Sequence, residues 1–89
     1  MTTRTDNLMR PVINLNGTSP EALIDARLEA RTACLALMSA LGGTQPNGRD
    51  YIGHPDAYKR DLAIYSARRL AIATILDDLE HEALAIQDR

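Results

Sequence analysis

The sequence has very few of the residues that staple a small protein. Cys34 is the only cysteine, so no intrachain disulfide can form, and this is typical of a protein from a reducing cytosol. Because Cys34 lies in an apolar helical stretch, we expect a buried structural thiol rather than a reactive one. A chain of 89 residues without such staples buries a modest core and is marginal as a monomer.

Long apolar runs and an excess of positive charge are also missing. No stretch of about 18 apolar residues occurs, and the N-terminus is too polar for a signal peptide, so we expect a cytoplasmic protein without membrane partners. The formal net charge is −2. This acidic balance argues against binding duplex nucleic acid, because such proteins need a basic surface against the phosphates.

Catalytic signatures are missing as well. Cys34 has no evident histidine partner, and neither a GxSxG nor a phosphate-loop motif is present. Asp77 and His81 have a spacing that can share a metal ion, but two ligands without a CxxC or HExxH motif favour a solvated helix face. His54 is more typical of a loop residue than of a catalytic base. We therefore expect no enzymatic activity, no metal and no cofactor.

What the sequence does contain is the pattern of two helices. Ser19 can cap a helix whose first residue is Pro20, although Thr18 and Glu21 offer an alternative capping box. Gly42–Gly43 predict a left-handed end to this helix. The second helix begins at Pro55 or Asp56 and contains no internal glycine or proline.

The expected fold is all-α: a two-helix antiparallel hairpin with a short extended N-terminal arm, in a single domain. Its segments are the arm at 1–18, helix one at 19–42, a loop at 43–54 and helix two at 55–87. Helix two, about 48 Å long, exceeds helix one by about ten residues. We expect the surplus to be the stretch LDDLEHEALAI, whose apolar side chains then need another chain or the arm as cover. This surplus predicts a homo-oligomeric helical bundle.

Helix two carries an apolar seam with a seven-residue repeat, which we expect to form the hairpin core. The seam contains Tyr58, Tyr65, Ile72, Leu79 and Ile86, with Leu62, Arg69, Leu76 and Ala83 at the companion positions. Helix one offers two apolar stripes, which again favours more than one neighbour. The facing stripe is Leu23, Ala26, Ala30, Cys34, Leu37 and Leu41, and the second stripe is Ile24, Leu28, Leu35 and Met38.

The turn between the helices gathers side chains suited to an anionic aromatic ligand. Phenylalanine and tryptophan are absent, so the aromatic residues are Tyr51, Tyr58 and Tyr65. Aromatic rings stack on bases, and the arginine fork binds phosphate. Arg69 interrupts the seam, and a buried arginine needs either an acidic partner or an anionic ligand. The candidate acids are Asp25, Asp61 and an acid of a neighbouring chain.

Two short motifs have both structural and functional interpretations. Arg49, Asp50 and Tyr51 follow Asn47–Gly48, a turn signal because both residues tolerate positive φ. Arg49 and Asp50 either pair with each other, cap the helix ends or form the wall of a site. The segment Asn16–Ser19 either caps helix one or holds an anion with its free N–H groups.

The order of these motifs resembles a family of small bacteriophage proteins. INLNGTSPEAL is followed about twenty-five residues later by PNGRDY, and then by a long helix that ends in LDDLEHEALAI. The resemblance covers about residue 12 to 86, and we associate the family with the fourth named group of phage anti-CBASS sponge proteins. It implies a homo-oligomer, a tetramer, that binds cyclic nucleotide signals of CBASS or Thoeris type at subunit interfaces. Such a protein sequesters the signal without cleaving it, in the cytoplasm of the infected host bacterium.

The resemblance also implies which residues bind the ligand. These are the residues of the two motifs, Asn16, Gly17, Thr18 and Ser19, then Arg49, Asp50 and Tyr51. With Tyr58, Tyr65 and Arg69 they form the expected ligand-binding set. Many relatives have a second aromatic residue after the tyrosine, where this chain has Ile52, which leaves a double-stacking role in doubt. The alternative functions are a small helical structural or assembly protein of phage origin, and a regulator that binds a partner by helix-in-groove packing.

Overall fold

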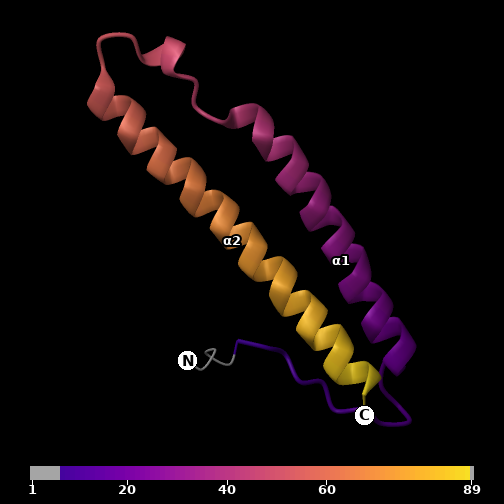
Figure 1. Cartoon of the computed structure of the whole chain (residues 1–89). Helices are drawn as coiled ribbons and strands as arrows, with labels where there is room; N and C mark the ends of the chain where they lie inside the picture. Colours follow the sequence, from indigo (N-terminus) through magenta and orange to yellow (C-terminus); the bar gives the residue numbers. More distant parts are fainter. Residues whose placement is uncertain (1–6, 89) are drawn as a thin grey trace.

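Two antiparallel helices joined by a loop form the structure, a computed structural model that describes residues 7–88 (Figure 1). Helix α1 spans Pro20–Leu41 and helix α2 spans Pro55–Gln87, while the loop contains the 3₁₀ turns η1, Gly42–Thr44, and η2, Gly48–Tyr51. The prediction of an all-α hairpin is confirmed. Helix α1 with its two capping residues, Ser19 and Gly42, covers the predicted range 19–42, and residues 1–6 of the predicted arm lie outside the described residues. Neither helix offers, within 7–88, a stretch apolar enough to cross a membrane.

The start of α1 follows the capping signals of the sequence. Ser19 has extended backbone angles, and its Oγ accepts a hydrogen bond from the Ala22 N–H at 3.1 Å. Pro20 occupies the first helical position, where no N–H is needed. The prediction that Ser19 caps the helix is therefore confirmed, and the alternative capping box is not formed.

Replacing Ser19 with alanine is expected to lower the free energy of unfolding by about 1 kcal/mol, because the Ala22 N–H loses its acceptor. Thr18→Ala is the matched control, since Thr18 is exposed and lies one residue outside the cap. Urea unfolding followed by circular dichroism measures both variants. A Thr18→Ala loss as large as that of Ser19→Ala would contradict this assignment.

Gly42 and Gly43 do not form the left-handed helix end predicted for them. Gly42 is right-handed, with φ −53° and ψ −31°, because α1 continues directly into η1 and the Thr44 hydroxyl donates to the Leu41 carbonyl at 2.8 Å. Asn47 is extended, and its side chain accepts from the Arg49 N–H at 3.0 Å. Among the described residues the positive φ falls on Gly53, at 82°. The left-handed end predicted at Gly42–Gly43 was wrong, whereas the turn predicted at Asn47–Gly48 is formed, since the Asp50 N–H donates to the Asn47 carbonyl at 2.9 Å.

The register of the hairpin is set by two ion pairs between the helices. Arg27 Nε lies 2.8 Å from Glu82 Oε1, and Arg31 Nε lies 2.7 Å from Glu80 Oε1. These pairs place the first half of α1 beside the last turns of α2. The part of α2 without a helical neighbour is therefore its N-terminal part, alongside which the loop runs (Figure 1). The predicted C-terminal overhang was wrong, because the loop takes up the extra length at the other end.

The seam of α2 forms the core, as the seven-residue repeat predicts. The buried side chains in residues 7–88 are Tyr65, Ile72, Glu82, Ala83 and Ile86. On α1 the half-buried stripe contains Leu23, Ile24, Arg27, Arg31, Cys34, Met38 and Leu41. The predicted facing stripe was thus partly wrong, since the ion-paired Arg27 and Arg31 stand where Ala26 and Ala30 were expected, and Met38 where Leu37 was. The predicted burial of the Cys34 thiol was also too strong, because Cys34 is half-buried.

Glu82 ties the N-terminal arm to both helices. Its Oε2 accepts a hydrogen bond from the Met9 N–H at 2.8 Å, while Oε1 accepts from Arg27. Arg27 also donates to the Leu23 carbonyl, and Pro11 and Ile86 line a small hollow beneath the arm. The arm therefore crosses the C-terminal turns of α2 (Figure 1).

Candidate functional site

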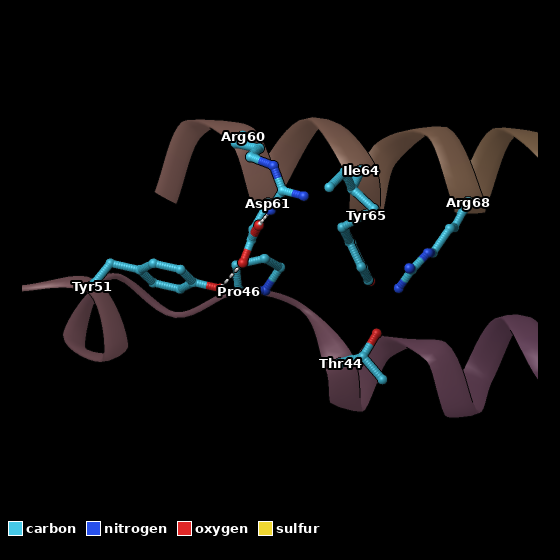
Figure 2. A pocket seen from close by; sticks show the side chains of 8 residues that line it. All are labelled: Thr44, Pro46, Tyr51, Arg60, Asp61, Ile64, Tyr65 and Arg68. Carbon is cyan, nitrogen blue, oxygen red and sulfur yellow. Dashed lines mark hydrogen bonds and ion pairs between the residues drawn. The ribbon is translucent and has the colours of Figure 1, made fainter. Parts of the chain in front are cut away.

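A hollow of about 270 Å³ lies where the loop faces the N-terminal part of α2 (Figure 2). Its lining is Thr44, Pro46, Tyr51, Arg60, Asp61, Ile64, Tyr65 and Arg68. Tyr65 and Arg68 point from α2 toward the loop at Thr44, while Tyr51 points in from η2. The hollow exists because a loop, rather than a helix, covers this part of α2.

Tyr51 is anchored to α2 by its hydroxyl and by its ring. The hydroxyl donates to Asp61 Oδ2 at 2.6 Å, and the ring centroid lies 5.3 Å from that of Tyr58 in a tilted arrangement. Arg60 Nη1 donates to the other carboxylate oxygen of Asp61 at 2.9 Å. Since both oxygens of Asp61 are engaged, this carboxylate braces the wall of the hollow.

The hydrogen bond to Asp61 raises the pKa of Tyr51 above its ordinary value of 10.0, aided by desolvation and by the negative charges of Asp61 and Asp50. Arg60 opposes the shift. A raised pKa in the folded state means that the neutral phenol is favoured by folding. This contribution to stability is complete below the unfolded pKa, about 10, and is lost as the pH rises through the higher folded value.

Tyr51→Phe is expected to remove this part of the alkaline pH dependence, because the variant has no phenol proton to lose. In the titration of tyrosinate absorbance, the transition at the highest pH should be present in the native protein and missing in Tyr51→Phe. Tyr58→Phe is the matched control, since the Tyr58 ring packs on Tyr51 but the hydrogen bond to Asp61 comes from the Tyr51 hydroxyl. If the highest transition persists in Tyr51→Phe, the assignment fails.

Positive charge inside the hollow comes from Arg60 and Arg68. Arg60 is committed to Asp61, whereas Arg68 makes no ion pair within residues 7–88 and its guanidinium points toward Thr44. Two arginines against one aspartate leave the lining with a net charge of +1. The fork of Arg68 is therefore available to an anionic ligand.

Arg69 lies outside the lining and does not have the environment predicted for it. Its side chain is exposed, its Nη1 donates to the Tyr65 hydroxyl at 3.3 Å, and its guanidinium lies 5.8 Å from the Tyr65 ring centroid. No acid pairs with it in the described part of the chain. The expectation of a buried arginine was wrong, because the register places the end of α1 near this position and leaves it open to solvent.

The predicted site residues divide between the two ends of the hairpin. Tyr51 and Tyr65 line the hollow, and Tyr58 packs on Tyr51. Arg49 and Asp50 lie on the same 3₁₀ turn as Tyr51, with exposed side chains outside the lining. Asn16, Gly17, Thr18 and Ser19 precede α1 and lie at the opposite end, beside the C-terminal end of α2 (Figure 1). A single chain therefore does not bring its two motifs together.

Arg60 and Arg68 are lining cations that were not among the predicted site residues. Arg68 lies seven residues after Asp61 and three after Tyr65, so helical spacing places these three side chains along one face. That periodicity is the signal that points to Arg68. The signal for Arg60 is weaker, because its guanidinium reaches the hollow only through its pair with Asp61.

The comparisons with known proteins assign no family. No family model matches the chain, and no curated protein and no solved structure matches it. The resemblance to the phage proteins stays a prediction.

The pair Asp77 and His81 lies on a solvated face of α2, as predicted. His81 Nδ1 is 2.8 Å from the Asp77 carbonyl oxygen, and both side chains are about half exposed. Within residues 7–88, no three His, Cys, Asp or Glu side chains are grouped so that they could hold a metal ion.

Proposed function

We propose that this protein binds and sequesters an anionic cyclic nucleotide, of the kind used in CBASS or Thoeris signalling, and does not cleave it. The observation that carries the proposal is the hollow at the turn, which combines the rings of Tyr51 and Tyr65 with the guanidinium of Arg68. A base requires a flat aromatic surface and a phosphate requires a fork donor. The order of the two motifs, which resembles that of the phage sponge proteins, supports the same ligand class.

The size of the hollow fits part of such a ligand. Sites for drug-sized ligands enclose about 300–1,000 Å³. At about 270 Å³, the hollow accommodates roughly one base with its phosphate. A cyclic dinucleotide would place its second half outside this chain, so the complete site belongs to a homo-oligomer. A tetramer in the cytoplasm of an infected bacterium is the assembly we propose.

The chemistry of the lining favours binding without reaction. It contains no histidine and no cysteine, and its carboxylate, Asp61, is already bonded to Tyr51 and Arg60. Thr44 Oγ1 donates to the Leu41 carbonyl, and no base in the lining is placed to activate it. We therefore propose that the protein sequesters its ligand without cleaving it.

A thermal-shift screen tests this function. Cyclic dinucleotides, cyclic trinucleotides and cyclic ADP-ribose isomers are compared with linear dinucleotides, and one cyclic class is expected to raise the melting temperature in proportion to RT ln(1 + [L]/Kd). Denaturing the complex should then release the ligand chemically intact. A screen in which no cyclic nucleotide stabilises the protein, or in which a cleaved product is recovered, would overturn the proposal.

Exposed leucines favour a second function, a structural or assembly adaptor of phage origin. Leu28, Leu35 and Leu84 are between 44% and 54% exposed and offer apolar surface to a protein partner. An adaptor of this kind would show no stabilisation by any cyclic nucleotide. The same thermal-shift screen therefore separates the two functions.

A further inference from the structure

Charge is distributed unequally along the hairpin. The turn end, residues 42–69, carries five basic and three acidic side chains. The terminal end, formed by residues 20–31 of α1 and residues 77–88 of α2, carries two basic and eight acidic side chains. The turn end is therefore +2 and these two helical segments together are −6, and Arg10 of the arm that crosses them brings the described residues of the terminal end to −5.

Ion pairs within the chain leave the net charge of each end unchanged and show which cations remain available. Arg27 and Arg31 at the terminal end are paired with Glu82 and Glu80. At the turn end only Arg60 has an acidic partner among the described residues. The cations without one are Arg49, Lys59, Arg68 and Arg69. Unpaired positive charge at one end and surplus acid at the other make the rod complementary to itself in reverse orientation.

The amount of exposed surface also leaves room for a partner. The accessible surface is 6820 Å² for a chain of 9.8 kDa, whereas a compact monomer of this mass exposes about 5,200 Å². No described side chain is fully buried. The excess of roughly 1,600 Å² is larger than the 800 Å² that each partner of a standard interface buries.

An apolar groove between the helices provides contact surface at the terminal end. It is about 430 Å³ and is lined by Ile24, Leu28, Arg31, Glu80, Ala83, Leu84 and Gln87. Leu35 lies two helical turns beyond Leu28 on α1, so it extends the apolar surface toward the turn end. Apolar surface supplies the affinity of such an interface, and the charges at its ends select the orientation.

We propose that two copies of this chain associate antiparallel, with the acidic terminal end of each on the basic turn end of the other. This orientation brings the partner subunit's Asn16 and its neighbours to the hollow that Tyr51 and Arg68 line. The two motifs that one chain holds apart then meet across the subunit boundary. This last step rests on the proposed function, whereas the orientation itself does not.

Energy transfer between labelled copies measures the orientation without any ligand. In a Cys34→Ser background, Ala57→Cys labels the turn end and Ala22→Cys labels the terminal end, both at exposed positions. Mixing donor-labelled Ala57→Cys with acceptor-labelled Ala22→Cys should give strong transfer, because the labelled ends lie together. Energy transfer only between copies labelled at the same end, or no transfer at all, would overturn the proposal. In the antiparallel arrangement two labels at the same end lie apart by about the length of α2, roughly 50 Å.

Charge reversal tests what selects the orientation. Asp25→Lys with Glu29→Lys should weaken self-association at least tenfold, and so should Lys59→Glu with Arg69→Glu. The protein carrying all four changes should regain association, because complementarity is restored with the signs exchanged. Added salt should weaken the wild-type association. Association unaffected by either reversed pair would contradict the electrostatic argument.

Complementation tests the shared site. Arg68→Ala and Asn16→Ala should each weaken binding of the cyclic nucleotide found by the thermal-shift screen. When the two variants are mixed, an antiparallel pair can contain one copy of each. The hollow of the Asn16→Ala copy then has its own Arg68 and receives the intact Asn16 segment of the Arg68→Ala copy, so mixing should restore part of the binding. Antiparallel transfer without restoration would remove Asn16 from the site and leave the orientation standing. Absence of any nucleotide binding would count against the proposed function alone.

Discussion

Glu82→Ala is expected to lower the free energy of unfolding by about 3–5 kcal/mol, the largest effect of a single substitution in this chain. The Glu82 side chain is 6% exposed and the Arg27 side chain 11%, so truncation leaves a nearly buried guanidinium without its counter-charge. The Met9 N–H loses its acceptor in the same step, which adds the release of the arm. Urea unfolding followed by circular dichroism measures the loss.

The matched control for this prediction is Glu80→Ala. Glu80 pairs with Arg31 in the same geometry, but the two side chains are about 40% exposed, so solvent screens the pair and its loss should cost about 0–1 kcal/mol. The double variant Arg27→Met with Glu82→Leu should recover most of the stability, because it removes both charges and fills the space. Equal losses for Glu82→Ala and Glu80→Ala would contradict the buried pair.

Arg68→Ala is expected to weaken binding of the cyclic nucleotide about tenfold to a hundredfold, the loss of a charge-assisted hydrogen bond worth about 1.5–3 kcal/mol. Arg68 points into the hollow and has no ion pair in residues 7–88, so the substitution should leave the melting temperature of the free protein almost unchanged. Arg68→Lys should recover only part of the affinity, because lysine keeps the charge and loses the fork. Titration calorimetry measures all three proteins.

Arg69→Ala is the control for Arg68→Ala, since it is the next residue and lies outside the lining. Arg69→Ala should change the affinity for the cyclic nucleotide less than threefold, and within the chain it should remove only the contact with Tyr65. Arg49→Ala tests whether the anion binds in the hollow or at the motif formed by Arg49, Asp50 and Tyr51. A loss at Arg49 or Arg69 that exceeds the loss at Arg68 would move the anion site out of the hollow.

The local features of the fold are predictable from the sequence, because they depend on neighbours in the chain. Ser19 and Pro20 define the start of α1, Pro55 defines the start of α2, and the seven-residue repeat identifies Tyr65, Ile72 and Ile86 as core. Each of these signals is complete within a few residues. They are also the features in which sequence and structure agree.

The register and the path of the loop could not be predicted in the same way. A repeat of seven residues is satisfied equally well when one helix slides by a heptad, and here the choice is fixed by Arg27–Glu82 and Arg31–Glu80, pairs between distant segments. Gly42 permits a left-handed conformation but does not require one. The hollow depends on both register and loop, so its tyrosines were found from composition while Arg68 was missed.

The distribution of buried side chains gives the two ends of the hairpin different local stabilities. Glu82, Ala83 and Ile86 are buried within the last turns of α2, whereas Tyr65 is the buried residue near the loop. Segments with few buried contacts open at lower free energy than the rest of a protein. The hollow thus lies on the end that opens first, and a ligand that binds the closed form there also stabilises the weakest part of the molecule. Binding at the turn and local folding of the turn are then one equilibrium.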